Sequence, residues 1–231
     1  MQELTIVISG FDPYPHVEAN PALIVPDTLA AEGVPPLGDD DPLRNVRLNI
    51  HAVHMPVSFT KAWPTLRDTL ERTHPDIVIA TGLKRDARGI LLERCAINAK
   101  DTTRADADNV VPRRSLIDED GPAAYWTGLP LRAILNAFAR DDIPASLSSD
   151  AGIFVCNALF YRLQEWSATR PRTMSGFVNL PAINEHPHPK FGLTLAQQVT
   201  AARDVVREAA RYLLAPLSGD ILLPREEQPR A

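Results

Sequence analysis

Strand-type and helix-type patterns alternate along this chain, and that alternation limits the folds it can adopt. The strand patterns are short apolar or alternating runs at residues 4–9, 46–51, 76–82 and 176–181. The helical patterns repeat apolar side chains every three or four positions and begin near residues 130, 155 and 195. These patterns predict a three-layer α/β domain with a mostly parallel central sheet and helices on both faces.

The length and hydrophobic content predict how the chain is divided. At 231 residues and 45% hydrophobic content, the chain can bury one sizeable core. We therefore expect a single domain over residues 1–217, with loops at 31–44 and 101–121 that could be mobile. Residues 218–231 end in charged and proline-containing sequence, which predicts a flexible C-terminal tail.

The charge balance and the N-terminal sequence argue against several partners. Lysines and arginines number 24 against 29 acidic residues, so the formal net charge is -5. No global positive field then attracts nucleic acid. The N-terminal residues lack a signal-peptide pattern, and no apolar run is long enough to cross a membrane. We expect a cytoplasmic protein with no nucleic-acid or membrane partner.

The chain has two cysteines, Cys95 and Cys156, and neither lies in a CxxC or Cys/His metal-ligand spacing. Two cysteines are too few for a disulfide framework. We therefore expect no structural metal.

Cys156 is the candidate nucleophile. It follows a strand-like segment and a turn of small residues, and it opens an amphipathic helix. The positive end of a helix dipole lowers a thiol's pKa, and nearby backbone N–H groups can form an oxyanion hole. On position alone, however, an isolated cysteine with apolar neighbours is more often a small core residue.

Several motifs occur in the order found in one enzyme family. They are Gly10-Phe11-Asp12-Pro13-Tyr14, Glu93-Arg94-Cys95-Ala96-Ile97-Asn98, Asp120-Gly121-Pro122 and Ala151-Gly152-Ile153-Phe154-Val155-Cys156-Asn157. In this respect the chain resembles the type I pyroglutamyl peptidases, over about residues 4–214. That resemblance implies a cysteine peptidase that removes N-terminal pyroglutamate with a Glu-Cys-His triad and no cofactor.

The resemblance also implies roles for individual residues. Cys156 would be the nucleophile, and Glu93 would orient and stabilise an imidazolium, although alone it would be read as an exposed charge beside Arg94. Phe11 and Tyr14 match the aromatic positions that sandwich the flat lactam ring; alone, both would be expected to pack under the N-terminal loop. Asn20 matches a side chain that tethers the loop around the substrate pocket.

The chain departs from the family pattern at the expected site. Asn179 stands where the family has its catalytic histidine, and an asparagine cannot accept and return a proton near neutral pH. Pro15-His16 replaces a glycine pair. Residues 83–89 replace a glycine-rich turn, which predicts a reshaped pocket wall.

Two histidines could substitute for the missing proton carrier. His16 follows the aromatic pair, and His186 lies in the loop after the strand that carries Asn179. Each would have to come within about 3 Å of the Cys156 sulfur or of a bridging water.

Two main functions therefore stay open. The first is a pyroglutamyl-peptidase-type hydrolase acting on a small peptide or pyroglutamyl substrate. The second is a catalytically inactive relative that binds a lactam, a peptide terminus or a protein partner. A third, weaker possibility is a small-molecule hydrolase or phosphorylase that uses Arg85 and Arg88 as anion contacts. The resemblance also implies a homo-oligomer.

Overall fold

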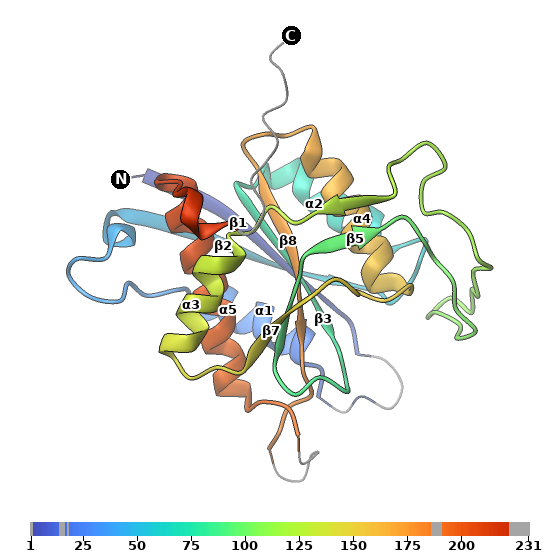
Figure 1. The fold of residues 1–231 in the computed structure, drawn as a ribbon, viewed down its shortest axis with the longest axis horizontal. Coiled ribbons are helices and arrows are strands. Elements are labelled where there is room, and N and C mark those ends of the chain that lie inside the picture. The colour runs from blue at the N-terminus through green and yellow to red at the C-terminus, as the bar shows by residue number, and fades with distance from the viewer. Residues whose placement is uncertain (1, 14–16, 18, 186–190, 222–231) are drawn as a thin grey trace.

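The fold is a six-stranded sheet between two layers of helices (Figure 1). The structure, a computed structural model, describes residues 2–13, 17, 19–185 and 191–221. The large sheet consists of β1 (Gln2–Phe11), β2 (Val46–Met55), β3 (Ile77–Leu83), β4 (Ile90–Glu93), β7 (Ala145–Ser148) and β8 (Met174–Leu180), in the order β2-β1-β3-β8-β4-β7. A small second sheet pairs β5 (Cys95–Ile97) with β6 (Ala124–Trp126).

The large sheet is mostly parallel, as the sequence predicts. β1 pairs in parallel with β2 and with β3, and β3 pairs in parallel with β8. The direction reverses once, because β4 runs antiparallel to β8 and β7 runs parallel to β4. A strand as short as β4 gives little periodic signal, and the sequence analysis did not identify it.

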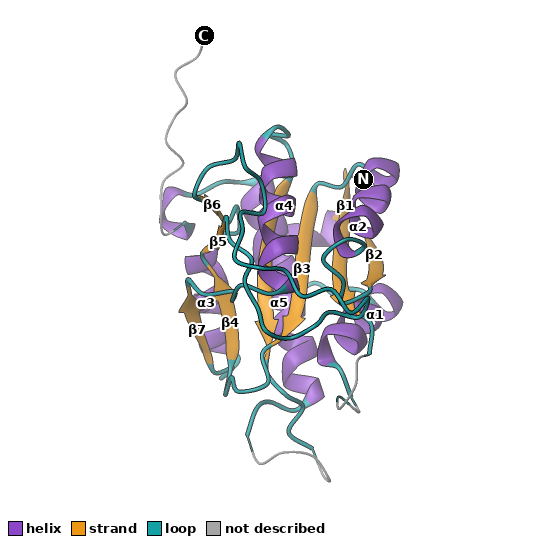
Figure 2. Cartoon of the chain, turned by 90° about the vertical axis from the view of Figure 1, so that its right-hand side faces the viewer, coloured by secondary structure: helices purple, strands orange, loops and turns teal. Residues whose placement is uncertain are grey.

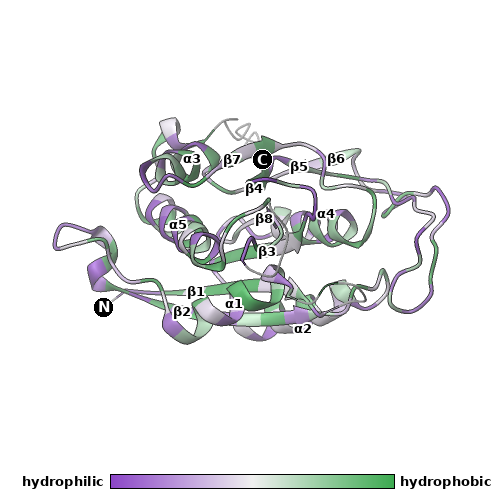
Figure 3. Cartoon of the chain, turned by 90° about the horizontal axis from the view of Figure 1, so that it is seen from below, coloured by the Kyte–Doolittle hydropathy of each residue, from purple (hydrophilic) through white to green (hydrophobic). Residues whose placement is uncertain are grey.

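Helices cover both faces of this sheet (Figures 2 and 3). On one face, apolar side chains of α1 (Pro21–Glu32), α3 (Leu131–Arg140) and α5 (Leu195–Leu214) pack against the strands. On the other face, α2 (Ala62–Thr73) and α4 (Val155–Ala168) form a second core. The prediction of a three-layer α/β domain is confirmed.

Strand alternation assigns each side chain of the central strands to one of the two cores. In β3, Ile77 and Ile79 belong to the α1/α3/α5 core, whereas Val78 and Ala80 belong to the α2/α4 core. In β8, Val178 faces the first core and Phe177 the second. Because successive side chains of a strand point to opposite faces, Gly82 and Asn179 lie on the α2/α4 face.

The loop at 31–44 is shorter than predicted, since α1 extends to Glu32 and a 3-10 turn, η1 (Pro42–Asn45), leads into β2. At the C-terminal end, residues 218–220 form the 3-10 turn η2 (Ser218–Asp220) against α3. The remainder of the predicted tail, residues 222–231, lies outside the described residues. No helix in the described part of the chain combines the length and the apolar character needed to span a bilayer.

Candidate active site

Glu93 and Asn179 meet on the α2/α4 face, where β4 and β8 run side by side. Asn179 pairs with Leu91 of β4 and with Gly82 of β3 in the sheet register. Its amide Nδ2 donates a hydrogen bond of 2.7 Å to Glu93 Oε1, and both side chains are buried. Burial raises the pKa of the Glu93 carboxyl, and contacts with Ser148 and Asn179 offset only part of that rise.

Gly82 leaves the space in which Cys156 and Asn179 approach each other. A Cβ atom at Gly82 would lie 3.1 Å from Cys156 Sγ and 3.0 Å from Asn179 Oδ1. The sulfur and the amide oxygen therefore face the same small gap above β3. Since Asn179 Nδ2 is bound to Glu93, the atom that it presents on this side is a hydrogen-bond acceptor.

Cys156 lies in the first turn of α4, as its sequence context predicts. No side chain caps this helix at Phe154, so the N–H groups of the first turn are available to an oxygen of a ligand. The helix-dipole argument predicts a lowered thiol pKa, and that prediction is wrong in direction. Burial raises the pKa of Cys156 to about 12.

Arg104 is a neighbour of the sulfur that the sequence analysis did not assign to the site. Its guanidinium lies 4.3 Å from the centre of the Phe154 ring, directly before α4. The positive charge of Arg104 lowers the pKa of Cys156, although less than burial raises it.

The loop that carries Arg104, residues 98–123, is attached at both ends rather than free. Near its middle, Asp106 Oδ2 accepts from the backbone N–H of Phe59, and Ser58 Oγ donates to Asp108. Near its far end, Asn98 Oδ1 accepts from the backbone N–H groups of Ile117 and Asp118. The prediction that residues 101–121 form a loop is confirmed, and these bonds fix its course.

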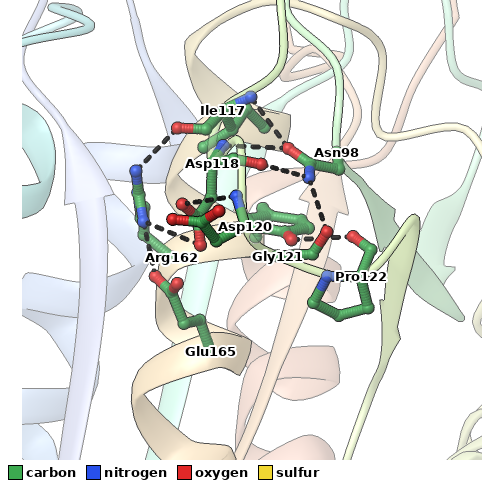
Figure 4. Close-up of polar contacts among 9 residues, drawn as sticks. Asn98, Ile117, Asp118, Asp120, Gly121, Pro122, Arg162 and Glu165 are labelled. Atoms are coloured by element: carbon green, nitrogen blue, oxygen red, sulfur yellow. Dashed lines mark hydrogen bonds and ion pairs between the residues drawn. The ribbon is translucent and has the colours of Figure 1, made fainter.

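Side chains of helix α4 form hydrogen bonds with the same loop (Figure 4). Arg162 donates to the carbonyl oxygen of Ile117 at 2.6 Å, and the Tyr161 hydroxyl donates to that of Pro122 at 2.8 Å. Asn157, the residue after the thiol, bonds to the backbone of Ile97 in β5 and to the carbonyl of Ala99. The helix that positions Cys156 therefore also positions the loop that brings in Arg104.

Phe11 is the last residue of β1, and Asn20 lies beside it. Phe11 is only 3% exposed and belongs to the α2/α4 core. Asn20 Nδ2 donates to the Phe11 carbonyl oxygen at 2.9 Å, and its Oδ1 accepts from the backbone N–H of Ala22. Asn20 thus caps α1 and links the start of this helix to the end of β1.

Three residues named from the sequence lie outside the described residues, namely Tyr14, His16 and His186. The structure brings together Glu93, Asn179 and Cys156, and it places Phe11 at the end of β1, which β3 separates from β8. Among the residues that the structure describes, no group of three or more His, Cys, Asp or Glu side chains is arranged to hold a metal ion.

A family profile described as Pyroglutamyl peptidase matches residues 4–211. The chain belongs to the pyroglutamyl peptidase family. The pyrrolidone-carboxylate peptidase of Bacillus subtilis is 35% identical over 210 residues, which cover 90% of this chain and 93% of that protein. The corresponding Pseudomonas fluorescens protein is 38% identical over 181 residues, covering 78% of this chain and 79% of that one.

Solved structures of the family share the fold. Pyroglutamyl peptidase I of Bacillus amyloliquefaciens superposes with a TM-score of 0.80 at 30% identity, covering 91% of this chain and 98% of that chain. Pyrrolidone carboxyl peptidase of Thermococcus litoralis gives a TM-score of 0.79 at 26% identity, covering 96% of this chain and all of that chain. Family and fold thus agree with the resemblance that the motifs indicate.

Proposed function

We propose that this protein removes pyroglutamate from the N-terminus of peptides, with Cys156 as the nucleophile and with turnover slowed by Asn179. Membership of the pyroglutamyl peptidase family supports the substrate class. The observation that carries the proposal is the grouping of Cys156, Asn179 and Glu93 around the gap above Gly82.

The reaction follows acyl transfer to sulfur. After its proton passes to water, Cys156 Sγ attacks the carbonyl carbon that joins the pyroglutamyl ring to the next residue. The backbone N–H groups of the first turn of α4 stabilise the oxyanion. When the C–N bond breaks, the leaving amine takes a proton from water. A second water then hydrolyses the thioester, which releases pyroglutamate and restores the thiol. The chemistry needs no cofactor.

Asn179 sets the rate of this reaction. A positioned general acid–base group typically contributes about 10²–10⁴-fold to rate, and an amide cannot perform that task near neutral pH. The Glu93–Asn179 bond keeps the amide oriented. Slow turnover is therefore the expected behaviour, with solvent handling the protons; His16 or His186 would replace solvent only by reaching the sulfur.

The decisive experiment compares purified protein with its Cys156→Ser variant on a pyroglutamyl amide that releases a fluorescent amine. We expect slow turnover by the wild-type protein and none by the variant. Equal rates for the two proteins would rule out the proposed role of Cys156.

A second candidate function is binding without hydrolysis. It is favoured by the raised pKa of Cys156, about 12, together with the acceptor that Asn179 presents near the thiol. Titration with pyroglutamate and a pyroglutamyl peptide distinguishes the two functions. Micromolar binding without turnover would support an inactive relative that retains the pocket.

The proposal also covers the location and the assembly of the protein. We place the protein in the cytoplasm as a homo-oligomer, in keeping with what the family resemblance implies. Size measurement by light scattering tests the assembly, and a monomer at micromolar concentration would contradict it.

A further inference from the structure

Lys84 lies beside the site in the turn that replaces the family's glycine-rich segment. Its backbone N–H donates to the Leu180 carbonyl oxygen at 2.9 Å, so the β3–β8 ladder continues one residue beyond β3. By strand alternation, Lys84 shares the α2/α4 face with Gly82, and Leu83 and Arg85 do not. The side chain of Lys84 thus emerges on the same face as the thiol and Asn179.

The charged groups around the thiol come from three segments. Glu93 belongs to β4, Arg104 to the loop at 98–123, and Lys84 to the end of β3. The charges of Arg104 and Lys84 lower the pKa of Cys156, whereas that of Glu93 raises it. Asn179, on β8, carries no charge.

Lys84 also acts on Glu93. Its charge lowers the pKa of that carboxyl, as it lowers the pKa of Cys156. The side chain is half-buried. Other cations form ion pairs elsewhere, and none of the ion pairs among the described residues uses Lys84.

We propose that the ammonium group of Lys84 adds to the positive charge of Arg104 in stabilising the thiolate of Cys156, at a site that lacks the family's histidine. The thiol proton leaves to water, and Lys84 stays protonated throughout. Lys84 is therefore a positioning residue that acts through electrostatics, and it does not carry the proton. The inference rests on Cys156 being the proposed nucleophile, but it concerns ionisation of the thiol and not turnover.

The test is the rate at which iodoacetamide alkylates Cys156, followed in a Cys95→Ser background from pH 7 to 9. Only the thiolate reacts, so below the thiol's pKa each unit of increase in that pKa lowers the rate about tenfold. We expect Lys84→Met to lower the rate about tenfold at each pH. Lys84→Arg, which keeps the charge, should retain most of the rate.

Arg85→Met is the matched control. It removes one positive charge from the same turn, but Arg85 is exposed. By strand alternation, Arg85 lies on the opposite face of the sheet from Lys84. We expect it to change the alkylation rate less than twofold. Equal rates for Lys84→Met and the wild-type protein, or equal losses for Lys84→Met and Arg85→Met, would overturn the inference.

This experiment is independent of hydrolysis. If the protein fails to cleave pyroglutamyl amides and Lys84→Met still slows alkylation, the proposed function fails while the role of Lys84 stands. If cleavage occurs and the alkylation rate of Cys156 is the same in Lys84→Met and the wild-type protein, only the inference about Lys84 fails. Circular dichroism of each variant excludes unfolding as the source of a change.

Discussion

Two buried carboxylates on opposite faces of the sheet have different neighbours. On the α2/α4 face, Glu93 accepts a hydrogen bond from the neutral amide of Asn179. On the α5 side, Asp204 contacts the guanidinium of Arg207 at 2.5 Å, and both side chains are almost fully buried. Asp204 therefore has a cationic partner, whereas the hydrogen-bond donor to Glu93 is a neutral side chain beside a thiol.

The comparison predicts that the two regions respond to different measurements. Changes around Glu93 should alter chemistry at Cys156, and changes around Asp204 should alter stability. The cluster on α5 extends to Arg211, which contacts Asp41 at 3.1 Å, so it joins the helix to the segment before β2. Both the turnover rate and the unfolding free energy should be measured for each variant.

The largest effect should come from Asn179→His. An imidazole at this position could bond to Glu93 and exchange a proton with Cys156, and we expect turnover of a pyroglutamyl amide to rise about 10²–10⁴-fold. Steady-state rates give the measurement. Asn179→His combined with Glu93→Gln is the control, and it should lose much of the gain because the imidazole then lacks its carboxylate. An unchanged rate for Asn179→His would place the defect in the substrate pocket.

The second-largest effect should be a loss of unfolding free energy in Arg207→Met. Arg207→Met leaves the buried Asp204 without its ion-pair partner, and breaking such a pair typically costs about 3–5 kcal/mol. Urea unfolding at pH 8 should show this loss. Arg203→Met is the control, because Arg203 pairs with the more exposed Glu32 and should cost about 0–1 kcal/mol. Similar losses in the two variants would contradict the contrast between buried and exposed pairs.

Asp204 also predicts a pH dependence. Burial and the nearby Asp141 raise the pKa of Asp204 to about 7, from a reference value of 3.8. The folded protein therefore holds a proton that the unfolded chain releases, so Asp204 lowers stability as pH rises from about 4 to 7. Each unit of pKa difference corresponds to about 1.4 kcal/mol.

The measurement for this pH dependence is the difference in unfolding free energy between Asp204→Asn and the wild-type protein. Because asparagine does not titrate, the difference should move in favour of the variant by on the order of 1–3 kcal/mol between pH 4 and pH 7. A difference that is constant over this range would contradict the raised pKa.

Gly82→Ala should reduce the unfolding free energy less than Arg207→Met does. Its Cβ would lie 2.9 Å from the Phe177 ring, in addition to its contacts with the sulfur and the amide oxygen. We expect a cost of about 1–3 kcal/mol from overpacking, with slower alkylation of Cys156. Gly219→Ala, which meets open space, serves as the control. Unchanged stability and alkylation in Gly82→Ala would show that the gap is wider than described.

The sequence predicted the fold better than the electrostatics of the candidate site. Hydrophobic periodicity was sufficient to predict the central strands and α4, and the ordered motifs singled out Cys156 and Glu93 as candidates. The short β4 was missed because four residues carry little pattern, although this strand places Glu93 beside Asn179.

The features of the candidate site that the sequence did not predict also have physical causes. The pKa of Cys156 depends on how deeply the sulfur is buried, and a helix-start pattern does not reveal that depth. Arg104 lies in a loop and Lys84 in a turn, and tertiary packing determines where such segments lie relative to the thiol. Alternation could have indicated the face of Lys84, since the position lies two residues after Gly82.

The most direct test of Cys156 as the nucleophile is the intact mass of the protein, measured after acid quenching during incubation with a pyroglutamyl amide. We expect one pyroglutamyl group bound through a thioester to Cys156 in the wild-type protein, and none in Cys156→Ser. A label on another residue, or release of pyroglutamate by Cys156→Ser at the wild-type rate, would contradict this assignment.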